Sequence, residues 1–85
     1  MRVVVLYKEQ TDYARQVEEF TTDFLRQTGH ELETLNPESS EGIRFCEAYD
    51  IMEFPTLMAI SNDGQVQNQW TGVPLPTISE VSYYV

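Results

Sequence analysis

The pattern of apolar and polar positions predicts a chain of short strands and helices. An unbroken apolar run, Val3 to Tyr7, opens the chain and is typical of a central strand that is covered on both faces. A second such run, Thr56 to Ile60, follows Pro55, and the first position of a strand is where a missing N–H disturbs the sheet least. We therefore expect these two strands to be buried in the interior of a sheet.

Helical spacing governs the segment that follows the first strand. Large apolar residues recur there every three or four positions and would line one face of a helix: Tyr13, Val17, Phe20 and Phe24. Thr11 is a candidate N-cap, with Asp12 in the positively polarised first turn. Gly29 is in the position where a left-handed residue often ends a helix.

Two further helices are expected later in the chain. One begins at Ser39 or Ser40 and would turn four residues inward: Ile43, Phe45, Cys46 and Tyr49. Gly42 should weaken this helix by roughly 1 kcal/mol relative to alanine. Thr77 and Glu80 have the spacing of a capping box, which predicts a short last helix.

Two more strands complete the pattern. Residues 31–35 alternate only in part and suggest a strand near an edge. Asn62-Asp63-Gly64 is a strong hairpin signal, and residues 65–71 then alternate, with Val66 and Trp70 inward and three glutamines outward. The predicted order is β-α-β-α-β-β-α, in which the first β-α-β unit is a right-handed parallel crossover.

The stretch from Phe45 to Gly72 resembles the C-terminal half of the thioredoxin superfamily. It contains Phe-x-x-x-Tyr-x-Ile-x-x-Phe-Pro-Thr-Leu, a strand, the Asn-Asp-Gly turn, a second strand and a closing glycine. The resemblance implies one domain over residues 1–85 with a thioredoxin-like three-layer α/β/α sandwich. It implies a mixed four-stranded sheet in the order 2-1-3-4, two helices on one face and one on the other, and a cis bond between Phe54 and Pro55.

The reactive residues of that superfamily are missing from this chain. Glutaredoxins carry Lys-x-x-Cys-Pro-Tyr-Cys after the first strand. This chain has Lys8 and Tyr13 where that motif has its lysine and tyrosine, but Thr11 and Ala14 in place of the two cysteines. Disulfide exchange needs a thiolate, and a threonine hydroxyl is far too basic to replace it. We therefore expect a redox-inactive protein. The alternative is a glutaredoxin- or thioredoxin-like oxidoreductase of cell redox homeostasis that uses a non-standard or a partner's cysteine.

Cys46 is the chain's one cysteine, and it corresponds to a small buried residue in thioredoxins. A buried free cysteine usually behaves as a small apolar residue, so we expect Cys46 to be structural. The resemblance also implies a vestigial active-site groove beside the cis proline. This groove could bind a protein or peptide by strand addition, could have a regulatory role, or its residues could merely pack. Its candidate residues are Lys8, Thr11, Tyr13, Phe54, Pro55, Gly72 and Val73. Glutathione is an unlikely ligand, because Glu53 would repel this anion and the acidic residues that hold its amino group are missing.

The charge of the chain limits the kinds of partner that it can bind. Fourteen acidic against five basic residues give a net charge of −9, which argues against nucleic acid and anionic membranes as partners. His30 is the single histidine, the four glycines never cluster, and we expect no metal site, phosphate loop or cofactor. The chain lacks a signal-peptide pattern and a membrane span, and we expect a cytoplasmic protein.

Overall fold

The computed structural model describes all 85 residues. The elements follow the predicted order and have these bounds: β1 Arg2–Leu6, α1 Ala14–Thr28, β2 Glu33–Leu35, α2 Ser40–Tyr49, β3 Thr56–Ile60, β4 Val66–Thr71 and α3 Ile78–Ser82. The main difference in extent is β2, which is two residues shorter at its start than the predicted strand. The chain enters β2 through Leu32, which is buried in the core.

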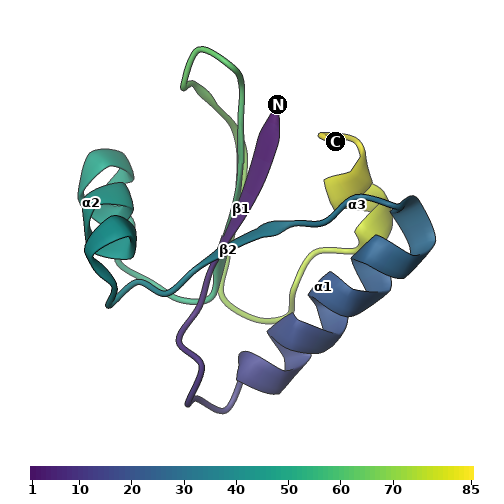
Figure 1. Ribbon diagram of the computed structural model, residues 1–85, viewed down its shortest axis with the longest axis horizontal. Helices are drawn as coiled ribbons and strands as arrows, with labels where there is room; N and C mark the ends of the chain where they lie inside the picture. The colour runs from purple at the N-terminus through teal and green to yellow at the C-terminus, as the bar shows by residue number, and fades with distance from the viewer.

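The four strands form one sheet in the order β2-β1-β3-β4, as predicted. β1 and β2 are parallel, whereas β3 runs antiparallel to both of its neighbours, β1 and β4. Figure 1 shows the sheet nearly edge-on, with α2 on one side and α1 and α3 on the other. The predicted three-layer arrangement is therefore confirmed, and the two chain ends lie near the same end of the molecule.

The core consists of two apolar layers, one on each face of the sheet. On the face of α1 and α3, Phe24, Val17 and Val81 pack against alternate residues of β1 and β3. On the face of α2, Met58 and Ile60 belong to a smaller cluster. Every residue of β3 is buried, as its uninterrupted apolar run predicts for a strand covered on both sides.

The start of α1 differs from the prediction. The helix begins at Ala14, Tyr13 occupies the N-cap position, and no side chain caps the helix. Thr11 is not the N-cap, because its hydroxyl donates a hydrogen bond of 2.7 Å to the carbonyl of Lys8 instead. Threonine side chains often bond to nearby backbone in this way, in competition with helix capping. The C-terminal prediction is confirmed, since Gly29 ends α1 with φ 76°.

The second helix shows why Gly42 is present. Ser39 is the N-cap and its hydroxyl accepts the Gly42 N–H at 3.0 Å. A Cβ on Gly42 would lie 1.9 Å from the carbonyl oxygen of Asn36, so the glycine permits a close backbone approach. The glycine therefore lets α2 pack closely against the backbone of Asn36, whereas the sequence alone suggested only that it weakens the helix. The prediction that Ile43 points inward is wrong: this residue is 45% exposed.

A register shift in the β3–β4 ladder overturns the prediction for Val66. The shift falls between Ala59 and Ile60, so Val66 pairs with Ile60 whereas Asn68 pairs with Ala59. Cross-strand partners share a face. Val66 is therefore placed on the α2 face, away from Trp70, and is 43% exposed. Trp70 packs on the opposite, α1–α3 layer.

The last helix is attached to the sheet by Tyr84, which follows the end of the helix. The Thr77–Glu80 capping box is present, as predicted. The ring of Tyr84 meets that of Trp70 edge-on at 5.7 Å, and its hydroxyl accepts a 3.1 Å hydrogen bond from the Asn68 amide. These contacts fix α3 against β4.

Candidate functional site

The loop between β1 and α1 is organised by three of the predicted site residues. The Lys8 N–H donates to the Tyr13 hydroxyl at 3.3 Å, and the Lys8 carbonyl accepts from Thr11. The Thr11 carbonyl in turn accepts the Ala14 N–H at 3.2 Å. These bonds fold the loop back on itself and place Thr11 at the entrance of α1.

A second loop brings Phe54 to the same corner. The Lys8 ammonium lies 5.5 Å from the centre of the Phe54 ring, a cation–π distance that joins the loop after β1 to the loop before β3. Pro55 is buried, whereas Phe54 is half-buried. The Phe54–Pro55 peptide bond is cis. The contact between Lys8 and Phe54 thus joins two residues that are far apart in the sequence.

Gly72 and Val73 approach from the end of β4. The Gly72 N–H donates to the Pro55 carbonyl at 2.8 Å, and Gly72 has φ 80°, a conformation that favours glycine. Val73 is exposed, and the Val73–Pro74 bond is also cis, which the sequence analysis did not anticipate. We call the residues gathered here the α1 corner: Lys8, Thr11, Tyr13, Phe54, Pro55, Gly72 and Val73.

Two shallow clefts flank the α1 corner. Lys8 and Thr11 line one cleft of about 370 Å³ with Asn36 and Glu38, at the carboxyl ends of β1 and β2. Val73 lines the other with three residues, Gln16, Pro74 and Leu75. The corner residues thus contribute to separate depressions of the surface. A ligand on the corner would lie across the surface, as an extended chain does.

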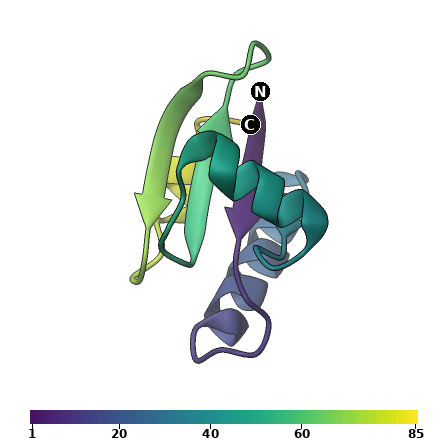
Figure 2. The ribbon, with the colours of Figure 1, turned by 90° about the vertical axis from the view of Figure 1, so that its left-hand side faces the viewer.

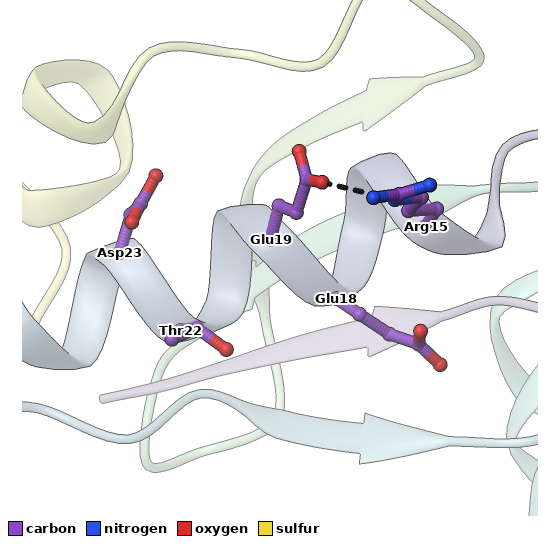
Figure 3. A pocket seen from close by; sticks show the side chains of 5 residues that line it. All are labelled: Arg15, Glu18, Glu19, Thr22 and Asp23. Carbon is purple, nitrogen blue, oxygen red and sulfur yellow. Dashed lines mark hydrogen bonds and ion pairs between the residues drawn. The ribbon is translucent and has the colours of Figure 1, made fainter.

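Another cleft runs along the outer face of α1 and has no apolar lining. Its lining residues all come from this helix: Arg15, Glu18, Glu19, Thr22 and Asp23. Figure 3 shows that the side chains of Glu18 and Glu19 point in opposite directions. The Arg15 guanidinium is engaged with Glu19 at 3.3 Å. Because the polar groups diverge and pair with each other, this cleft has no convergent set of ligand-binding groups.

The backbone of the α1 corner carries unused hydrogen-bonding groups. The amides of Arg15 and Gln16, in the first turn of α1, have no partner within the protein, and neither have the N–H and C=O of Phe54. The first amides of a helix carry partial positive charge and favour acceptors. The corner therefore presents both donors and an acceptor to a molecule outside the chain.

No thiol is part of the α1 corner. Cys46 lies on α2, where it packs against the cluster on the opposite face of the sheet from α1. Burial raises the pKa of the Cys46 thiol above its ordinary value, which lowers its thiolate fraction. The position thus fits a small packing residue better than a nucleophile.

Other titratable groups do not form a second centre. Burial, and then the charge of Glu18, raise the pKa of Tyr7, whose hydroxyl donates to that carboxylate at 3.3 Å. No three histidine, cysteine or carboxylate side chains are grouped so that they could hold a metal ion. None of the helices combines the length and the apolar character needed to cross a membrane.

Comparison with known proteins establishes the fold. The chain is similar in structure to thioredoxin 1 from the thermophilic eubacterium Thermosipho africanus TCF52B, with a TM-score of 0.70 over 99% of this chain and 89% of the other. Sequence identity is 11%, so the likeness concerns the fold. The chain has a thioredoxin-like fold. No protein-family model matches the chain, and no curated protein matches its sequence.

Sequence reasoning missed part of the α1 corner. The proximity of Lys8 and Phe54 depends on how two loops are placed by separate strands, and no local pattern announces it. The open N–H and C=O of Phe54 were not missed, because the resemblance implied strand addition at the residue before Pro55, and both groups are unpaired in the structure. The proline after Phe54 was the one available signal, since proline often ends regular pairing.

Proposed function

We propose that the chain is a redox-inactive thioredoxin-like module that binds an extended peptide segment at the α1 corner. The observation that carries this proposal is the unpaired N–H and C=O of Phe54, which lie on one residue next to the buried Pro55. A strand-like peptide can satisfy both groups at once, in the manner of strand addition. This mode of binding requires backbone groups and no cysteine.

The absence of thiol chemistry at the corner supports a binding role over a catalytic one. Thr11 takes the place of the attacking cysteine, and its hydroxyl is occupied by the Lys8 carbonyl. No imidazole or carboxylate side chain bonds that hydroxyl to activate it. Nucleophilic catalysis at Thr11 is therefore disfavoured, while the open backbone groups remain available.

The chemistry of the corner also limits the ligand. Glu9 and Glu38 line the cleft beside Lys8, so that side is acidic apart from one ammonium group. The other side is apolar, with the exposed Val73 beside Pro74 and Leu75. An uncharged or mildly basic peptide with an apolar side chain toward Val73 fits this surface, whereas glutathione, which is anionic, does not.

The test is an amide NMR titration of the ¹⁵N-labelled protein with an acetylated and amidated hexapeptide of alternating valine and threonine. The proposal predicts saturable shifts at Thr11, Phe54 and Val73. It predicts no comparable shifts with glutathione. If the hexapeptide leaves these amides unmoved, or if glutathione moves them more strongly, the proposal is wrong.

Two arginine variants provide a matched control. Thr11→Arg places a long side chain beside Lys8 at the corner and should weaken hexapeptide binding about tenfold or more by obstructing it. Thr22→Arg adds the same charge to an exposed position farther along α1 and should leave the affinity unchanged. Equal weakening in both variants would show that charge, and not access to the corner, governs binding.

A further inference from the structure

The outer edge of β4 is a second surface with open backbone groups. β4 is the last strand of the sheet and pairs only with β3, and Figure 2 shows its arrow at the margin of the sheet. Exposed edge strands usually carry charges or prolines that prevent further pairing. The strand Val-Gln-Asn-Gln-Trp-Thr contains no charged residue and no proline. The one irregularity that could hinder further pairing is the register shift near its first residues.

The ladder determines which groups point outward. Hydrogen-bonded and non-hydrogen-bonded pairs alternate along antiparallel strands. The Gly72 N–H bonds to the Pro55 carbonyl and so points toward β3. Trp70 and Asn68, two and four residues earlier, therefore also direct their backbone N–H and C=O groups toward β3. The backbone groups of Gln69 and Thr71 therefore face the open edge. The Asn68 side chain covers only the Gln69 N–H, at 2.8 Å.

A cleft on the α2 face lies directly beside this edge. It has a volume of about 340 Å³ and is lined by four residues of the α2–β3 connection, the first residue of β3 and two residues of β4: Asp50, Ile51, Met52, Glu53, Thr56, Gln69 and Thr71. Met52 is 83% exposed, although it is apolar. Two carboxylates and no basic side chain line the cleft, so its charge is negative.

The charge of the rest of the chain identifies the kind of partner. Three arginines are already engaged with carboxylates: Arg2 with Glu33, Arg15 with Glu19, and Arg26 with Asp23. A second copy of the chain would bring another net charge of −9 and a second pair of carboxylates to the same edge. Like charges placed opposite each other oppose pairing. A basic partner removes this repulsion.

We propose that β4 accepts an extended lysine- or arginine-containing segment of another protein as a fifth strand. The segment pairs with the backbone of Gln69 and Thr71. Alternate side chains of the segment lie over the cleft, where their ammonium or guanidinium groups meet Asp50 and Glu53 and their methylene stems cover Met52. This surface is separate from the α1 corner, and the proposal does not depend on peptide binding there.

The test uses the full chain and an acetylated, amidated octapeptide of alternating lysine and valine. Amide NMR should show saturable shifts at Gln67, Gln69 and Thr71. The same octapeptide with an N-methyl group on every residue keeps its charge but has no backbone N–H on either edge to pair with β4, and it should bind about tenfold more weakly. Equal binding of the methylated peptide, or shifts confined to the acidic face of α1, would overturn the proposal.

Charge variants test the role of the cleft. Asp50→Asn/Glu53→Gln should weaken binding of the octapeptide about fivefold, and Asn suits the left-handed backbone of Asp50, whose φ is 56°. Asp12→Asn/Glu31→Gln removes the same charge outside the cleft and should leave the affinity within about twofold. If the two double variants weaken binding equally, or if the free protein dimerises through β4, the proposed partner is wrong.

Discussion

The starts of α1 and α2 are built in opposite ways. At α2, the Ser39 hydroxyl accepts the Gly42 N–H and Glu41 adds negative charge to the first turn. At α1, no side chain caps the helix, no acid lies in the first turn, and the amides of Arg15 and Gln16 are unpaired. The difference indicates that the start of α2 is closed, in the sense that a side chain next to the helix caps a free N–H. The start of α1 is open and leaves its N–H donors available.

Packing explains how α1 tolerates an open start. The helix spans fifteen residues and buries Val17 and Phe24 against the sheet. Tertiary packing of an apolar face contributes most of the stability of a protein helix, so a missing cap is affordable there. The shorter α2 buries less, and its start depends on local contacts. The next three predictions test this comparison, from the largest expected effect to the smallest.

Gly42→Ala should give the largest loss of stability. The new Cβ would meet the Asn36 carbonyl oxygen at 1.9 Å, so the backbone before α2 must move. We expect the free energy of unfolding to fall by about 3 kcal/mol, at the upper end for overpacked sites. Urea unfolding of the purified variant measures the change.

Gly29→Ala is the control for this substitution. It strains a left-handed residue at the end of α1, but its Cβ would meet no atom within 4 Å. It should therefore lower the free energy of unfolding by only about 1 kcal/mol. A loss at Gly42 no larger than the loss at Gly29 would refute the close approach of α2 to Asn36.

The next prediction compares the two serine or threonine residues at the helix starts directly. Ser39→Ala removes the α2 cap and should destabilise the protein by about 1 kcal/mol. Thr11→Ala removes a loop hydrogen bond and no cap, and should cost about 0.5 kcal/mol or less. The midpoints of urea unfolding will distinguish them. Equal losses would mean that the start of α1 depends on Thr11 as a cap after all.

The smallest effect concerns α3, whose start is also closed. Hydrogen bonds from the backbone and the hydroxyl of Thr77 lower the pKa of Glu80 from its ordinary value of 4.5. A carboxyl group with a lowered folded-state pKa binds fewer protons in the folded than in the unfolded protein. Its stabilisation is therefore present above the unfolded-state pKa and is lost as the pH falls through the folded-state pKa.

Glu80→Gln should remove this part of the acid dependence. Melting temperatures measured from pH 6 to pH 2.5 should fall less steeply in the variant than in the wild type, by a small margin because Glu80 is fully exposed. Carbon NMR of the wild-type carboxyl group provides an independent check. Titration of Glu80 at or above its ordinary value would contradict the closed start of α3.

The fold was predictable because several independent local patterns agreed. The unbroken run of β3, the Asn-Asp-Gly turn and the Thr77–Glu80 box each indicate one structure, and the structure contains all three. The layer order followed from the resemblance to thioredoxins around Pro55. Such patterns depend on nearby residues, and the tertiary structure did not oppose them.

The misplaced residues are those whose environment depends on distant parts of the chain. Val66 changed face because the β3–β4 ladder shifts register, which no alternation within β4 reveals. Gly42 was interpreted by its helix propensity, although its contact with Asn36 determines its role. At the α1 corner, the sequence indicated the missing cysteines and the candidate residues. It did not indicate the Lys8–Phe54 contact, which depends on where two separate loops lie.

The most direct test of the account is insulin reduction by dithiothreitol, followed by turbidity, with three proteins. We expect the wild type and Cys46→Ser to match the rate of dithiothreitol alone, since the α1 corner has no thiol. The Thr11→Cys/Ala14→Cys variant should exceed that rate, because it returns two thiols to the open start of α1. A wild-type rate above background that disappears in Cys46→Ser would contradict the claim that this thioredoxin-like protein is redox-inactive.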